Sequence, residues 1–131
     1  MPEINRDFAK KDDSSDYVFL YVEEAHATDE WPISSSRFMP NDEIVSIKQP
    51  VTSSERVTVA RDFAKTFDVS SMTVLIDDPK DNAFEKAYAP WPIRMYVIEN
   101  GKLQYISAPT DCSHDLGELR EWLEKRHGKT I

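Results

Sequence analysis

The sequence has few of the residues that cofactor and metal sites usually require. Its 131 residues include three glycines and one cysteine. A phosphate-binding loop needs two or three glycines within one turn, so a glycine-rich nucleotide site is excluded. The single cysteine, Cys112, excludes an intramolecular disulfide framework and any CxxC pair for redox chemistry or zinc. The histidines show no HxxxH spacing, and we therefore expect no cofactor and no metal site within the chain.

Positive charge and long apolar runs are also scarce. There are 16 Lys and Arg residues against 24 Asp and Glu residues, which gives a net charge of −8. A nucleic-acid partner is not expected, because phosphate backbones are bound by clustered basic side chains. No segment approaches the roughly 18 apolar residues of a membrane-spanning helix, and the first residues lack the apolar core of a signal peptide. The sequence therefore predicts a cytoplasmic protein that does not bind a membrane.

Length and apolar periodicity predict a single α/β domain over residues 1–131. Helices are expected over residues 3–11, 52–69, 82–89 and 113–126, and strands over residues 17–25, 72–76, 95–98 and 103–107. The last two strands should form a hairpin around Asn100 and Gly101, and Thr52 to Glu55 has the pattern of a capping box. Residues 27–52 are expected to form a long irregular loop.

This order of elements predicts a thioredoxin-like fold that lacks its first strand. Strands that alternate with helices form a mostly parallel sheet, and a final hairpin plus helix is how a thioredoxin-like domain ends. That fold begins with a central strand and a helix that carries the nucleophile, whereas the first element here is already a helix. Without the central strand, we expect the chain to be poorly stable, to form a homodimer by strand exchange, or to bring the strands at 17–25 and 95–98 together.

Glu24 and His26 form the best candidate site. They lie at the end of the apolar strand that begins at Tyr17, and open α/β sheets bind ligands beyond the carboxyl ends of their strands. Because side chains alternate along a strand, the two residues are expected on one face, about 7 Å apart. A carboxylate beside an imidazole can orient the ring and help it to transfer protons near neutral pH. The alternative is that the strand has simply left the core and become polar.

The residues around this pair resemble the signature of the iodothyronine deiodinase family. Residues 21–31 read Tyr-Val-Glu-Glu-Ala-His-Ala-Thr-Asp-Glu-Trp, and the family has Tyr-Ile-Glu-Glu-Ala-His followed by a small residue and Ser-Asp-Gly-Trp. Further matching stretches follow in the same order over nearly the whole chain, at residues 54–56 with Ala60, 74–77, 87–89 and 94–101. A match of this extent identifies the family but not the substrate.

The resemblance implies a thioredoxin-fold reductase in which a selenocysteine or cysteine attacks iodine on an aromatic ring. By the matching positions, Tyr21, Glu24 and His26 lie around that nucleophile. Glu24 and His26 would contact the substrate and pass a proton to the ring as iodine leaves. The electrons would come from an external thiol.

Three further residues are implied as supporting or substrate-binding groups. Trp31 closes the matching signature, and Arg94 opens the last matching stretch. Pro92 occupies the position where thioredoxin-like folds often hold a cis proline beside the active site.

Several positions depart from the vertebrate members of the family. Gln49 and Pro50 stand where those members carry a histidine after the long loop. Pro109 falls near an arginine that clamps the amino-acid end of thyroid hormone, and Ile93 replaces a carboxylate. These departures resemble the bacterial deiodinase-like redoxins, and we expect a small aromatic iodide rather than thyroid hormone as the substrate.

The nucleophile itself is expected outside this sequence. Family members carry it early in the helix before the signature strand, which places it about two helical turns before Met1. Selenocysteine is encoded by a codon normally read as stop, so a gene model that restarts at the next methionine would begin here. Cys112, just before the last predicted helix, either acts as a resolving thiol or is a free loop cysteine without a partner.

Two other functions stay open. Peroxiredoxin-like enzymes use the same scaffold to reduce peroxides, and activity on peroxide or on aryl iodide would distinguish them. A non-catalytic thioredoxin-like binding module is the second alternative, since the sequence has no thiol at the expected position. We expect the 131 residues alone to show no dehalogenase turnover.

Overall fold

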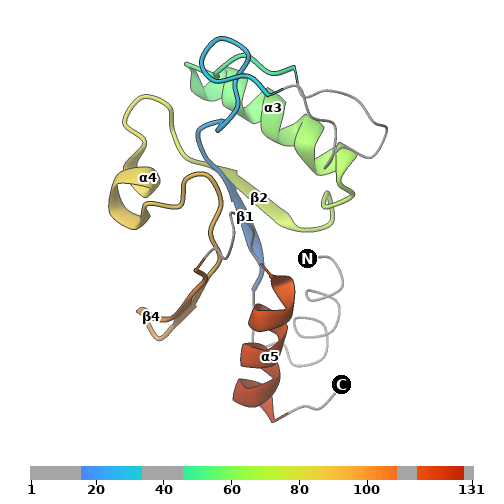
Figure 1. The fold of residues 1–131 in the computed structure, drawn as a ribbon, viewed down its shortest axis with the longest axis vertical. Coiled ribbons are helices and arrows are strands. Elements are labelled where there is room, and N and C mark those ends of the chain that lie inside the picture. Colours follow the sequence, from blue (N-terminus) through green and yellow to red (C-terminus); the bar gives the residue numbers. More distant parts are fainter. Residues whose placement is uncertain (1–15, 34–45, 109–114, 129–131) are drawn as a thin grey trace. The chain divides into compact units, whose positions relative to one another are not determined.

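The computed structural model describes residues 16–33, 46–108 and 115–128 (Figure 1). Its elements, in chain order, are β1 (Val18–Tyr21), α3 (Ser53–Thr66), β2 (Thr73–Ile76), α4 (Ala83–Tyr88), β3 (Tyr96–Glu99), β4 (Lys102–Ile106) and α5 (Leu116–His127). They belong to two compact units, of which one is Tyr17–Pro92 and the other contains Ile93–Ile131. The predicted helix over residues 3–11 and the middle of the predicted loop, at residues 34–45, lie outside the described residues.

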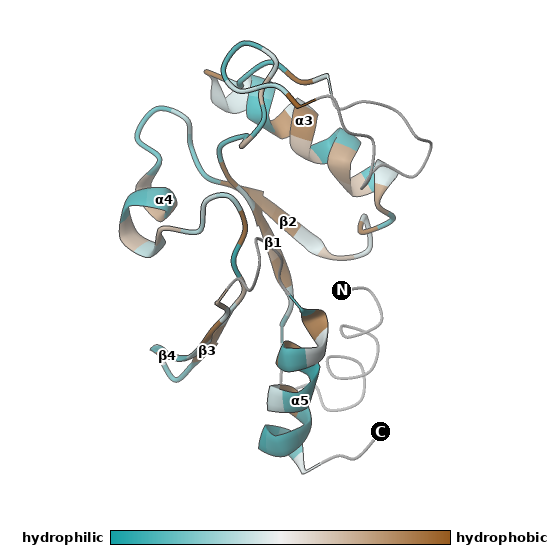
Figure 2. Ribbon diagram, viewed as in Figure 1, coloured by the Kyte–Doolittle hydropathy of each residue, from teal (hydrophilic) through white to brown (hydrophobic). Residues whose placement is uncertain are grey.

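β1 and β2 form a parallel pair, as the sequence predicts. They are hydrogen-bonded in register from Val18 opposite Thr73 to Tyr21 opposite Ile76, and α3 is the crossover helix between them. Both strands are hydrophobic along most of their length (Figure 2). Because the strands are parallel, their carboxyl ends meet at one edge, and the chain segments that follow them emerge close together.

The core of this unit lies between the two strands and α3. Phe63 of α3 packs edge-on against the rings of Phe19 and Tyr21, with centroid distances of 5.9 and 5.6 Å. Ala64 and Met72 are buried in the same cluster. Edge-to-face ring pairs contribute about 0.5–1.5 kcal/mol beyond the burial of apolar area. This packing fixes β1, and therefore the segment that leaves it, on α3.

α3 is capped at both ends by its own sequence. The Thr52 hydroxyl accepts the N–H of Glu55 at 3.2 Å, and the Glu55 carboxylate accepts the N–H of Thr52 at 3.2 Å, so the predicted capping box is confirmed. The helix ends at Thr66, before the predicted position. The reason is that Asp68 takes a left-handed φ of 52° and the N–H of Val69 turns back to a helix carbonyl at 2.9 Å.

The other unit holds the predicted hairpin and the final helix. β3 and β4 pair antiparallel, and φ is 52° at Asn100 and 72° at Gly101. Positive φ at both central residues is the pattern of the type I′ turn that an Asn-Gly pair favours. α5 begins at Leu116, where the Asp115 carboxylate caps it by accepting the N–H of Gly117 at 2.7 Å. The predicted start at Ser113 lies outside the described residues.

The architecture is therefore α/β, with a parallel strand pair, an antiparallel hairpin and a C-terminal helix. This agrees with the predicted fold class and is consistent with a thioredoxin-like fold. Within the described ranges each sheet has two strands, and the absence of a central first strand stays a prediction. The helices in these ranges include none that is long and apolar enough to cross a bilayer.

Candidate functional site

The segment that carries the predicted site leaves the sheet earlier than expected. β1 ends at Tyr21, so the prediction of a strand up to residue 25 is wrong. The partner strand β2 ends at Ile76, the residue paired with Tyr21, and offers residues 22–25 no strand to pair with. The N–H of Asp77 still donates to the Tyr21 carbonyl at 2.9 Å, and Asp77 then leads toward α4. Glu24 lies in an irregular segment and His26 in a turn beyond the strand. Strand alternation therefore does not determine the orientation of the two side chains.

Glu24 is partly buried, and one oxygen of its carboxylate is removed from water. Its Oε1 atom is buried and has no hydrogen-bond partner among the described residues. Burial raises the pKa of the Glu24 carboxyl, while the positive charge of Arg56 and the imidazole of His26 act in the opposite direction. Because the pKa rises overall, burial outweighs these two attractions. Glu24 therefore takes up a proton more readily than an exposed glutamate.

His26 is oriented by the turn that follows it. Its Nδ1 lies 3.1 Å from the carbonyl oxygen of Trp31, and its ring lies against the Trp31 indole with centroids 5.1 Å apart. A carbonyl oxygen only accepts hydrogen bonds, so Nδ1 carries the hydrogen and Nε2 is left for proton transfer. His26 also acts electrostatically on Glu24, and both residues lie in the segment between β1 and Trp31.

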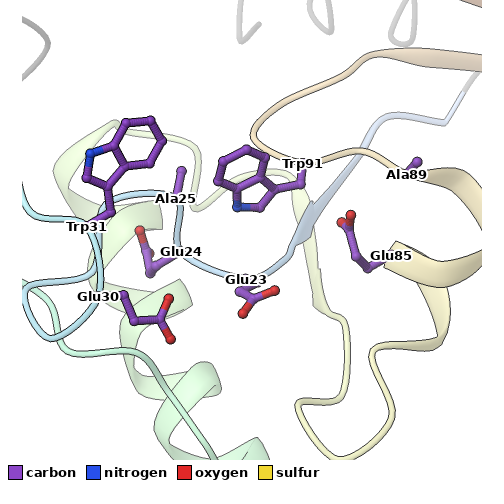
Figure 3. A pocket seen from close by; sticks show the side chains of 8 residues that line it. All are labelled: Glu23, Glu24, Ala25, Glu30, Trp31, Glu85, Ala89 and Trp91. Atoms are coloured by element: carbon purple, nitrogen blue, oxygen red, sulfur yellow. The ribbon is translucent and has the colours of Figure 1, made fainter.

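An open pocket of about 490 Å³ adjoins this pair. Its lining comes from the segment after β1 and from α4 and the residues after it, and consists of Glu23, Glu24, Ala25, Glu30, Trp31, Glu85, Ala89 and Trp91. Figure 3 shows the two indole rings on either side of Ala25. His26 is not in the lining, but its ring packs against Trp31, which is. The pocket follows the carboxyl ends of β1 and β2, which is where the sequence predicts ligand binding.

Glu85 is the second carboxyl in this pocket with a perturbed pKa. Burial raises the pKa of Glu85, a hydrogen bond from the backbone of Trp91 lowers it, and the charges of Glu23 and Asp77 raise it further. Its Oε2 atom is buried without a partner in the described part of the chain. No sequence motif points to Glu85. The order of elements could have indicated it: α4, which carries Glu85, follows β2, and the carboxyl end of β2 lies beside that of β1.

Arg56 connects α3 by hydrogen bonds to the segment between β2 and α4, the helix that carries Glu85. The residue is 1% exposed, and its Nη1 donates to the Asp77 carbonyl at 2.7 Å and to the Asn82 side-chain oxygen at 2.9 Å. The Asp77 carboxylate accepts the backbone N–H groups of Phe84 and Glu85, both at 2.9 Å. These hydrogen bonds satisfy the first turn of α4 and fix the direction in which it leaves β2.

The raised pKa of the Glu24 carboxyl predicts how the stability of the protein depends on pH. The folded state raises the pKa of Glu24, so the folded protein binds this proton more tightly than the unfolded chain does. This contribution to stability is complete below the unfolded pKa and is lost as the pH rises through the folded pKa. Glu24→Gln should therefore melt at a higher temperature than the wild type at about pH 7, with no such difference at about pH 3. Equal melting temperatures at both pH values would show that the carboxylate is not destabilising.

The other predicted site residues have different surroundings. The Tyr21 ring packs on Phe63 of α3 and does not line the pocket. The peptide bond between Trp91 and Pro92 is cis, as expected for that position. Arg94 belongs to the other unit, and Cys112 lies outside the described residues. The functional roles of these residues stay predictions.

The chain matches one protein family and several curated proteins. The iodothyronine deiodinase family matches residues 1–127. Type II iodothyronine deiodinase of Homo sapiens is 27% identical over 117 residues, which are 88% of this chain and 41% of that protein. Thyroxine 5-deiodinase of Sus scrofa is 30% identical over 110 residues, which are 84% of this chain and 33% of that protein. The chain thus spans less than half the length of these relatives. Because the family match covers nearly all of the sequence and includes the Glu24–His26 segment, the protein belongs to the iodothyronine deiodinase family.

Proposed function

We propose that this chain carries the proton-transfer and substrate-binding part of a deiodinase-type oxidoreductase that removes iodine from small aromatic iodides. The observation that carries the proposal is the pair formed by Glu24 and His26. Glu24 has a buried oxygen without a partner among the described residues, and Trp31 orients the imidazole. Family membership supports the reaction class.

The reaction must balance a proton and two electrons. The nucleophile expected upstream of Met1, a selenocysteine or cysteine, would take iodine from the ring, and two equivalents of an external thiol would be oxidised to a disulfide and release iodide. The ring carbon keeps the electron pair of the broken carbon–iodine bond and must take up one proton. Nε2 of His26 is suited to donate this proton from the imidazolium form, in which both ring nitrogens carry a hydrogen, because the Nδ1 hydrogen is already committed to the Trp31 carbonyl. Glu24, with its raised pKa, can return a proton to His26.

The indole rings suit an aromatic substrate. Trp31 is 63% exposed and Trp91 is 41% exposed, and both line the pocket beside Glu24. Large aromatic faces that are open to solvent can pack on an aryl ring and remove apolar area from water. Four glutamates line the same pocket, so we expect a neutral or cationic aryl iodide to bind better than an anionic one.

The test uses the protein extended by its upstream coding sequence, with cysteine at the nucleophile position. We expect iodide release from an iodophenol in the presence of dithiothreitol, no release from the matching serine variant, and none from the 131 residues alone. Release that persists in the serine variant would contradict the proposal. Reduction of hydrogen peroxide without iodide release would favour the peroxiredoxin-like function instead. An upstream sequence with no in-frame TGA or Cys codon would also contradict it.

A further inference from the structure

Gln49 makes an unusual set of contacts with the site segment. Its side-chain Oε1 accepts the backbone N–H of Glu24 at 3.0 Å, and its Nε2 donates to the backbone carbonyl of the same residue at 3.0 Å. Nε2 also donates to the Glu30 carboxylate at 3.1 Å, and the backbone N–H of Gln49 donates to Asp29 at 2.9 Å. All four hydrogen bonds reach the segment between β1 and Trp31. The Thr28 N–H adds a backbone hydrogen bond to Ile47 at 2.8 Å.

At Glu24, the side-chain amide of Gln49 makes the hydrogen bonds that a neighbouring strand would make. β1 loses its partner at Tyr21, yet Glu24 is partly buried and its backbone needs one acceptor and one donor. A primary amide supplies both, because its oxygen and the N–H on the same side of the C–N bond point in one direction. A carboxylate at this position would accept the N–H but would face the Glu24 carbonyl without a proton to donate. The side chain of asparagine is one methylene shorter.

We infer that Gln49 is a positioning residue, whose amide fixes the Glu24 backbone so that the Glu24 carboxylate keeps its partly buried place at the pocket. As a role in catalysis this rests on the proposed function, but the positioning itself is a property of the folded chain. Its chemical basis is that a buried carboxylate is costly and would move toward water if its backbone were free to do so. Arg56 and His26, the charged or titratable groups that act on Glu24, are not hydrogen-bond partners of the Gln49 side chain.

The test measures the folded chain and needs no activity. Gln49→Met keeps the size of the side chain and removes all three of its hydrogen bonds. We expect the Glu24 amide hydrogen to exchange about 10- to 100-fold faster in Gln49→Met, while the Asp77 amide, which donates to Tyr21, keeps its rate. We also expect the pKa of the Glu24 carboxyl, followed by ¹³C NMR, to fall as the group gains water.

Gln104→Met is the matched control, because Gln104 is exposed on β4. It should change neither quantity. Unchanged exchange and unchanged pKa in Gln49→Met would overturn the inference. So would faster exchange at Asp77 and Glu24 alike, since that would show general destabilisation without positioning. The proposed function fails separately, if the nucleophile-bearing protein releases no iodide while the NMR result is as expected.

Discussion

Replacing His26 with asparagine in the nucleophile-bearing protein is expected to lower kcat/KM for an aryl iodide by about 100- to 10,000-fold, the usual contribution of a positioned general acid. Asparagine can still donate from its amide to the Trp31 carbonyl, which Nδ1 contacts at 3.1 Å. It cannot supply the proton that Nε2 would deliver. The variant therefore separates the chemical role of the imidazole from its structural one. Iodide release and the melting temperature are measured on the same preparation.

The controls for this prediction come from the neighbouring carboxyl and from the surface. Glu24→Gln should also reduce turnover, because glutamine cannot return a proton to His26. Glu121→Gln is the matched exchange at an exposed position of α5 and should leave turnover unchanged. Full activity of His26→Asn with an unaltered melting temperature would mean that the imidazole does not serve the reaction. Added imidazole is expected to restore part of the activity lost in His26→Ala, where the side chain leaves space.

Replacing Arg56 with methionine is expected to lower the free energy of unfolding by about 3–5 kcal/mol, since one buried and one partly buried hydrogen bond from a charged donor are lost. The Asp77 carbonyl and the Asn82 side-chain oxygen would lose their donor at 2.7 and 2.9 Å. Methionine fills much of the same volume, so the effect reports the lost polar contacts more than a cavity. Against a typical total of about 5–15 kcal/mol, such a loss is a large fraction of the free energy of unfolding. Urea unfolding measures it.

Arg61→Met provides the comparison for Arg56. Arg61 lies on α3 as well, but it is exposed, and the change should alter stability by no more than about 0.5 kcal/mol. Arg56→Met should also raise the pKa of Glu24 further, because the guanidinium lowers that pKa in the wild type. Equal losses in the two variants would show that the buried guanidinium contributes nothing specific to this unit.

Local patterns in the sequence predict much of the fold. The capping box at Thr52, the type I′ pattern at Asn100 and Gly101, and the parallel pairing of two apolar strands are all found in the structure. Each depends on neighbouring residues or on element order, and such information is present in a single sequence. The element ends are less well predicted. β1 stops at Tyr21 because its partner stops, which no property of residues 22–25 reveals.

The sequence by itself determined the family, the order of the described elements, and the choice of Glu24 and His26 as the candidate pair, because these depend on residue identity along the chain. The tertiary structure decided what surrounds that pair. It placed Glu85 and Trp91 in the same pocket, turned the amide of Gln49 onto the Glu24 backbone, and left one Glu24 oxygen buried without a partner among the described residues. It also buried Arg56, a residue type that is usually exposed. These contacts join residues far apart in sequence, and hydrophobic periodicity carries no information about them.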